Sequence, residues 1–185
     1  MPSVNFPASL TFTLSEEGGF ADNAADPGGA TMKGITLATY REFVPNATVD
    51  DLKAIPDFAV SFIYWSDYWR EMKCDALPGG IDLTVFDFGV NVGPSESVRM
   101  LQRAVGVDDD GDLGPISMSA IGAASPSSVI ASLAGAQKAY YQALPDFAMF
   151  GDGWVARTER RAVAALKIAS VAVQPSRVKM PGDVE

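Results

Sequence analysis

Apolar residues recur every three or four positions along most of the chain, which is the spacing of amphipathic helices. The glycines at 18–19 are suited to end the first of these helices. Its predicted inner face comprises Phe6, Leu10, Leu14 and Glu17.

Turn-forming residues separate this helix from the next ones. Residues 21–35 are rich in Gly, Pro, Asp and Asn, so we expect a loop or a short irregular strand there. Thr48 followed by Asp51 resembles a capping box, with Asp in place of the usual Glu. Further helices are predicted over 36–43, 48–55, 57–72, 81–92, 94–105, 126–144 and 154–172, with a short one opening at Pro115.

These patterns predict a mainly α fold with a small irregular β or loop region after the first helix. A modest break near 93–94 divides an N-terminal part, 1–93, from a helical part, 94–173. We expect the two parts to pack as one globule, followed by a tail over 174–185. No internal repeat is visible in the sequence.

Charge and composition exclude several classes of function. The net charge of -9 argues against nucleic acid as a partner. Because the chain has no His, a Ser-His-Asp triad is excluded, and we expect no metal ion or other cofactor. The lone Cys74 is interpreted as a buried or half-buried side chain rather than a catalytic thiol. The aspartates over 108–112 lack the closing Glu of a calcium loop, so we interpret them as a solvated acidic turn.

Positive charge gathers near the end of the chain. Residues 154–185 hold six Lys and Arg against three Asp and Glu. We interpret this region as a solvated basic helix face, or alternatively as a weak contact with an anionic polymer or membrane. We expect no signal peptide and no membrane anchor, because the N-terminus lacks a basic region and no apolar run approaches membrane-spanning length. We also expect a monomer.

Two carboxylates, those of Glu17 and Asp26, flank glycine-rich backbone near the N-terminus. Glu17 shares the predicted buried face of the first helix, whereas Glu16 points toward solvent. Burial and the C-terminal end of a helix both disfavour the charged form of Glu17, as a general acid requires. Asp26 and Thr31 can hold a water molecule opposite it. The alternative interpretations are an ordinary helix-end carboxylate for Glu17, a turn-forming residue for Asp26 and a loop or cap hydroxyl for Thr31.

Other residues are candidates for contact with a ligand. Gly29 and Gly34 let backbone approach a bulky ligand, or simply meet a need for positive φ angles. Asn91 either bonds an N-acetyl group or caps its helix. Along 57–72, the side chains of Phe58, Phe62, Trp65 and Trp69 share one apolar stripe. Trp65 is therefore interpreted mainly as core, while Tyr68 and Trp69 serve either as core or as platforms for sugar rings.

Several motifs in consistent order resemble glycoside hydrolase family 108, which comprises peptidoglycan muramidases of phages and of bacterial secretion systems. The resemblance covers roughly 6–170 and ends in a helical region usually called peptidoglycan-binding. Phe20 stands where the family more often has Tyr. The motifs are EGGF (17–20), DPGGATMKGIT (26–36), YWSDYW (64–69), LP (77–78), FDFGVNVGP (86–94), LQRAVGV (101–107) and DLGP (112–115).

The resemblance implies a lysozyme-like fold and hydrolysis of the β-1,4 bond between N-acetylmuramic acid and N-acetylglucosamine in peptidoglycan glycan strands. Glu17 is the implied catalytic acid, and Asp26 and Thr31 are carried over as its helpers. We expect inversion at the anomeric carbon. The alternatives are a lytic transglycosylase and a non-catalytic wall-binding protein. We expect synthesis in a host cytoplasm and action in the periplasm, after release through a holin pore or a secretion route.

Overall fold

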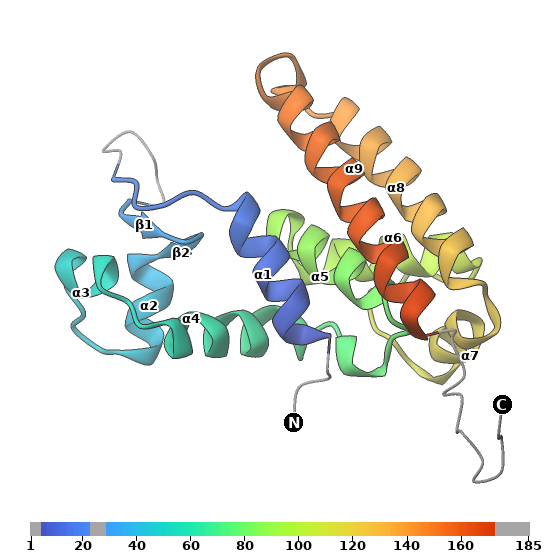
Figure 1. The fold of residues 1–185 in the computed structure, drawn as a ribbon, viewed down its shortest axis with the longest axis horizontal. Coiled ribbons are helices and arrows are strands. Elements are labelled where there is room, and N and C mark those ends of the chain that lie inside the picture. The colour runs from blue at the N-terminus through green and yellow to red at the C-terminus, as the bar shows by residue number, and fades with distance from the viewer. Residues whose placement is uncertain (1–4, 23–28, 173–185) are drawn as a thin grey trace, which may run out of the picture.

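The computed structural model describes residues 5–22 and 29–172 and shows a mainly α protein (Figure 1). Helix α1 (Phe6–Glu16) leads to a two-stranded antiparallel hairpin of β1 (Thr31–Met32) and β2 (Ile35–Thr36). A small helical group follows, built from α2 (Leu37–Phe43), α3 (Val49–Lys53) and α4 (Asp57–Tyr64). The expected loop or irregular strand after the first helix is thus confirmed over its described part.

The capping box that opens α3 is present as the sequence predicts. The Thr48 hydroxyl accepts a hydrogen bond from the Asp51 backbone, and the Asp51 carboxylate accepts one from the Thr48 backbone. Each interaction satisfies a backbone donor that a helix start leaves unpaired. Asp therefore replaces Glu in this role without loss of either bond.

Helix α5 (Ile81–Val92) forms the centre of the molecule. Its residues from Ile81 to Gly89 are all buried, and it contacts α1, α6, α8 and α9. In Figure 1, α1 lies between the hairpin group and the C-terminal helices. Those helices are α6 (Pro94–Val105), α7 (Pro115–Ala123), α8 (Pro126–Gln142) and α9 (Phe147–Ala172).

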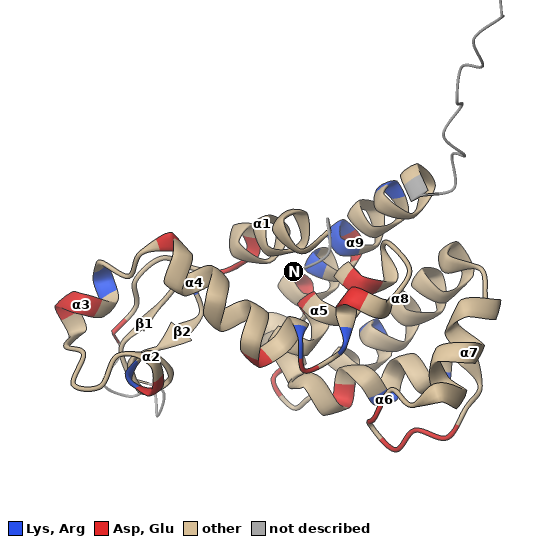
Figure 2. Cartoon of the chain, turned by 90° about the horizontal axis from the view of Figure 1, so that it is seen from below, with Lys and Arg blue, Asp and Glu red and all other residues tan. Residues whose placement is uncertain are grey.

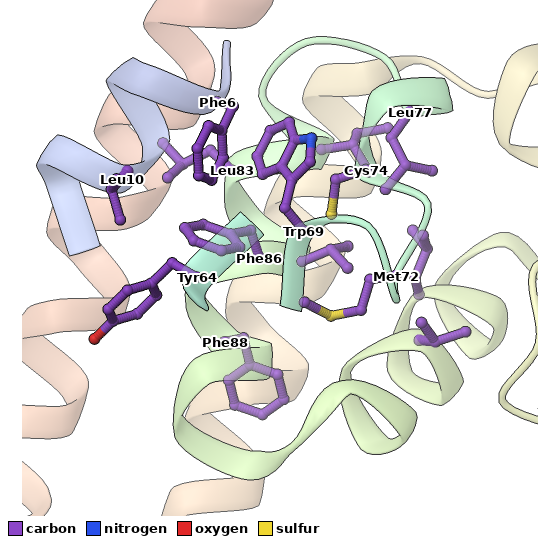
Figure 3. Packing of buried hydrophobic residues seen from close by; sticks show 14 of the residues in the cluster. Phe6, Leu10, Tyr64, Trp69, Met72, Cys74, Leu77, Leu83, Phe86 and Phe88 are labelled. Atoms are coloured by element: carbon purple, nitrogen blue, oxygen red, sulfur yellow. The ribbon is translucent and has the colours of Figure 1, made fainter. Parts of the chain in front are cut away.

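Aromatic side chains from three separate segments build the core beside α5 (Figure 3). The rings of Phe6, Trp69 and Phe86 meet edge to face, with centroids 5.2–6.0 Å apart. Trp69 and Phe86 have no exposed surface, and Cys74 is fully buried nearby. Each ring fully buried in this way contributes roughly 1.5–3 kcal/mol to folding. This cluster fixes the start of α1 on α5, and thereby the position where α1 ends.

The predicted helix over 57–72 is interrupted. After α4, the segment Trp65–Trp69 is a π-helical turn, in which the Arg70 backbone N–H bonds to the Trp65 carbonyl. The wider turn breaks the expected stripe: Trp69 is buried, Trp65 is half-buried, and Phe58 and Phe62 are 78% and 52% exposed. Periodicity assumes 3.6 residues per turn, so it cannot register an inserted residue.

Helix α9 differs from the prediction in where it begins and in the direction that its arginines face. Helix α9 begins at Phe147 rather than at 154. Arg157 and Arg161 face α1 and α5 rather than solvent, whereas Arg160 binds Glu16 of α1 with a side chain that is still 54% exposed. Figure 2 shows Lys and Arg segments of α9 in blue. The tail expected from 174 lies outside the described residues. Within 5–22 and 29–172, no single helix has the length and hydropathy of a membrane span, although α7 and α8 together pass that test across a bend of 110°.

Candidate active site

Glu17 is the residue that ends α1. Its backbone N–H bonds to the Thr13 carbonyl at 3.1 Å, and its own φ and ψ of -85° and 149° are extended. The side chain is 19% exposed, so the carboxylate lies at the surface of the packed interior. Leu10 on the same face is buried as predicted, whereas Leu14 is only half-buried.

Arg157 of α9 binds this carboxylate from the other end of the chain. Its Nη1 lies 2.9 Å from Glu17 Oε1. Its Nη2 and Nε lie 2.7 Å and 3.1 Å from the two oxygens of Asp87 on α5. One guanidinium therefore fixes Glu17 relative to the central helix.

Asp87 is fully buried and accepts from three side chains. Besides Arg157, Thr13 donates to its Oδ1 at 2.9 Å and Arg161 to its Oδ2 at 2.6 Å. Burial alone would raise the pKa of Asp87, but the bonds and charges of the two arginines hold that pKa below its ordinary value. Arg161 also donates to Gln137 of α8 at 2.6 Å and to the Thr158 hydroxyl at 3.2 Å. Two cations thus balance Asp87 and Glu17, as a buried ionic group requires.

Glu16 is also paired, contrary to the expectation of a solvent-facing charge. Arg160 binds both of its oxygens, at 2.7 Å and 2.6 Å, and the Glu16 side chain is only 12% exposed. The hydrogen bonds from Arg160 lower the pKa of Glu16. The adjacent glutamates thus meet arginines three residues apart on α9, and this double contact holds α9 against the end of α1.

The hairpin turn lies directly against Glu17. Lys33 and Gly34 form the turn with φ angles of +51° and +75°, the left-handed conformation that tight hairpins use. A Cβ atom on Gly34 would lie 2.5 Å from the Tyr64 hydroxyl and 3.1 Å from Glu17 Oε2. Glycine is therefore required at 34 for its φ angle and for the close approach of the Tyr64 and Glu17 side chains. The approach of a ligand to this backbone stays a prediction.

The other predicted site residues in and before the hairpin are Asp26, Gly29 and Thr31. Thr31 is half-buried on β1, and its hydroxyl donates to the Gly29 carbonyl at 3.3 Å. Gly29 has a φ of +63° with open space where a Cβ would be. Asp26 lies outside the described residues. The roles of Asp26, Thr31 and Gly29 therefore stay predictions.

The candidate sugar-binding residues separate into different environments. The interpretation of Trp69 as a platform for sugar rings is wrong, because its side chain has no exposed surface and its Nε1 donates to Asp75 at 2.6 Å. Trp69 belongs to the core. Tyr68 is half-buried, and burial, followed by the charges of Asp67 and Glu17, raises its pKa. Asn91 is exposed, and its amide donates to the Asp87 carbonyl at 3.0 Å. Tyr68 and Asn91 remain available to a ligand.

Comparison with known proteins places this arrangement in a family. Residues 10–93 match the family model of glycosyl hydrolase 108, and residues 96–159 match that of a predicted peptidoglycan domain. No functionally curated protein shows significant similarity to the chain. A solved structure entitled "Structure of Brucella abortus SagA" is 36% identical, with a TM-score of 0.79 over 89% of this chain and 95% of that one.

The chain belongs to the glycosyl hydrolase 108 family. It is a peptidoglycan-degrading, lysozyme-like glycoside hydrolase with peptidoglycan as its substrate. Within this family member, the region matching glycosyl hydrolase 108 supplies Glu17, Tyr64 and Asp87, and the region matching the peptidoglycan domain supplies Arg157. The second region therefore contributes a side chain that binds the proposed catalytic acid.

Four residues around this site were not predicted from the sequence: Tyr64, Asp87, Arg157 and Arg161. Asp87 lies among the apolar residues of the helix predicted over 81–92, and a carboxylate buried with them needs a cation. The basic residues of 154–172 were the available partners, and Arg157 and Arg161 are one helical turn apart. Tyr64 carried no comparable signal, because a Tyr in an aromatic helix is ordinarily interpreted as core.

Proposed function

We propose that the enzyme is an N-acetylmuramidase that hydrolyses the β-1,4 bond between N-acetylmuramic acid and N-acetylglucosamine. The observation that carries this proposal is the placement of Glu17, a partly exposed carboxylate held at 2.9 Å by Arg157 beside a glycine hairpin turn. Glycoside hydrolysis needs one carboxyl group to protonate the leaving oxygen as positive charge develops on the sugar.

In this mechanism Glu17 is the general acid. Its proton passes to the glycosidic oxygen while the bond from that oxygen to the anomeric carbon of N-acetylmuramic acid breaks. Water then adds to the same carbon and loses a proton, which leaves a reducing N-acetylmuramic acid end. Asp26 and Thr31 are proposed to orient or deprotonate that water. Tyr68 and Asn91 are proposed to contact the sugars, with Gly29 and Gly34 giving the glycan access.

Mass spectrometry of digested peptidoglycan tests the proposed bond and the proposed chemistry together. We expect muropeptides that end in reducing N-acetylmuramic acid. Anhydro-muropeptides would instead establish a lytic transglycosylase, and reducing N-acetylglucosamine ends would establish cleavage of the other glycosidic bond. Either result overturns the proposal.

We also propose that the enzyme reaches the wall from the cytoplasm, as a phage endolysin or a secretion-associated lysozyme does. The family resemblance motivates this, since such proteins depend on a pore or a secretion apparatus. Expression in a bacterial cytoplasm should cause lysis only when a holin is co-expressed. Lysis of equal speed without the holin contradicts this route.

A further inference from the structure

A groove of about 420 Å³ lies between α6 and α8, and none of its lining residues belongs to the candidate active site. Its lining is mostly apolar: Met100 is buried, Ala104 and Ala136 are half-buried, and Ala139 is exposed. All of the lining residues fall within 96–159, the region that matches the predicted peptidoglycan domain. A concave apolar surface with a few polar groups is the usual form of a ligand site.

The charged residues of the lining are Glu96 and Arg103. Arg103 donates through Nη2 to Glu96 Oε1 at 2.6 Å and through Nη1 to Asp109 Oδ2 at 2.7 Å, so two carboxylates share one guanidinium. Within the part of the chain that the structure describes, Oε2 of Glu96 accepts no hydrogen bond, and the side chain is 33% exposed. The groove therefore presents a partly neutralised carboxylate to a cationic group of a ligand.

The aromatic side chain of the lining, Tyr140, is packed against other rings. It is half-buried and meets Phe88 of α5 edge to face, with ring centroids 5.6 Å apart, and Tyr141 in the same way at 5.8 Å. The groove thus combines small alanine-lined hollows with a carboxylate, rather than an open aromatic face. This lining suits methyl groups and an ammonium group better than sugar rings.

We propose that the groove binds the peptide stem of peptidoglycan and that Glu96 binds the free side-chain amine of the stem. Such stems are short, carry alanine methyl groups, and contain a lysine or another diamino acid. The methyl groups match the apolar lining, and the ammonium group matches Glu96 Oε2. Because a crosslink between stems acylates this amine and removes its charge, the enzyme should prefer stems that are not crosslinked.

The groove lies within reach of a stem whose sugar occupies the active site. Asn91, a proposed sugar contact, precedes Glu96 by five residues, and five residues span at most roughly 18 Å. A stem of four extended residues spans roughly 13–14 Å, and its diamino side chain adds to that reach. This step rests on the proposed function, in which the N-acetylmuramic acid that carries the stem binds beside Asn91. Contact at a second place should lower KM without changing kcat.

The first test measures binding without catalysis. The synthetic stem L-alanyl-γ-D-glutamyl-L-lysyl-D-alanine contains no glycosidic bond and is titrated into the full-length enzyme. Methyl NMR signals of Met100, Ala104, Ala136 and Ala139 should shift together and saturate. A stem acetylated at the lysine amine should bind roughly twofold to fivefold more weakly. Absence of these shifts overturns the proposal, and so do shifts of the same methyl groups by N-acetylglucosamine oligomers but not by the stem.

Variants of exposed residues test the site itself. Ala139→Trp fills the groove and should weaken stem binding at least about fivefold. Ala131→Trp, at an exposed position of α8 outside the lining, is its matched control and should bind as the parent does. Equal binding by Ala139→Trp and the parent overturns the proposal.

Glu96→Gln tests the contact with the amine. This variant should bind the free and the acetylated stems equally, because it lacks the charge that distinguishes them. Asp109→Asn removes the other carboxylate that Arg103 binds but does not line the groove, so it should keep the preference for the free amine. A preference that survives in Glu96→Gln overturns the assignment of Glu96.

Hydrolysis kinetics then connect the groove to activity. Acetylation of the free amines of purified peptidoglycan should raise KM for the parent roughly twofold to fivefold at unchanged kcat, with no such rise for Glu96→Gln. Equal KM for both substrates in the parent overturns the preference. The NMR result stands apart from the proposed function: stem binding in the groove supports this inference even if another bond is cleaved, and its absence overturns the inference even if the enzyme is a muramidase.

Discussion

Arg157 and Glu17 lie 140 positions apart in the chain, yet their side chains meet at 2.9 Å. The contact joins the end of α1 to α9, and the same guanidinium also binds the buried Asp87. An arginine that binds two carboxylates holds them in one fixed geometry. The position of the proposed catalytic acid thus depends on the C-terminal helix.

Replacing Arg157 tests this dependence. Arg157→Lys keeps the charge but cannot bond Glu17 and both Asp87 oxygens together, so we expect kcat to fall roughly tenfold to a hundredfold, or about 1.4–2.8 kcal/mol of barrier. Steady-state hydrolysis of purified peptidoglycan measures the change. Arg160→Gln is the matched control, because it removes the neighbouring pair with Glu16 and should leave kcat within about twofold. Parent-like kcat in Arg157→Lys would contradict the proposed role.

Asp87→Asn tests the buried ionic group. It leaves Arg157 and Arg161 without their shared carboxylate, so we expect a loss of about 3–5 kcal/mol in the free energy of unfolding at pH 7. Urea unfolding monitored by circular dichroism measures this. Asp57→Asn, which breaks the exposed pair with Lys33, should change stability little. Equal stability of Asp87→Asn and the parent would contradict the account.

The lowered pKa of Asp87 also predicts that the stability of the protein depends on pH. Because the folded pKa of Asp87 is lowered, its stabilisation is complete above the unfolded pKa of about 3.9 and is lost as pH falls through the folded value. Unfolding measured from pH 7 to pH 2 should therefore show a steeper acid loss in the parent than in Asp87→Asn. Parallel curves for the two proteins would show that Asp87 does not carry this dependence.

Gly34→Ala tests the close approach of the hairpin to Glu17. The added methyl group would lie 2.5 Å from the Tyr64 hydroxyl at a φ of +75°, so both a clash and backbone strain result. We expect a loss of about 2–4 kcal/mol in stability together with a marked loss of hydrolysis. Gly29→Ala meets strain but no clash and should lose only about 1–2 kcal/mol. Equal losses for the two variants would show that the clash is not important.

Tyr68 and Trp69 are adjacent but should respond differently. Trp69→Ala removes a side chain with no exposed surface, and we expect a loss of about 3–5 kcal/mol in stability. Tyr68→Ala removes a half-buried ring beside Glu17, so KM for peptidoglycan should rise severalfold while the protein remains folded. Thermal unfolding and Michaelis kinetics distinguish the two effects. Unchanged KM in folded Tyr68→Ala would remove it from the sugar-binding set.

The sequence predicts local features of this protein better than distant contacts. The boundaries 81–92 and 94–105 and the capping box at Thr48 follow from periodicity and helix-end chemistry, and all are confirmed. The π-helical turn is not predictable in this way, because periodicity assumes a uniform turn. The pairing of Arg157 with Glu17 is a long-range contact that no local pattern contains. By contrast, the position of Glu17 at the end of α1 could be predicted from the helical pattern and from the glycines at 18–19 that follow it.

The most direct test of the central claim compares Glu17→Gln with Glu16→Gln. Each variant removes one carboxylate that binds an arginine of α9, so Glu16→Gln controls for the loss of such a contact. The release of reducing muropeptides from purified peptidoglycan should fall by at least about a thousandfold in Glu17→Gln, since the glycosidic oxygen loses its proton donor. Glu16→Gln should retain most of the activity. Parent-like release by folded Glu17→Gln would contradict the assignment of Glu17 as the catalytic acid.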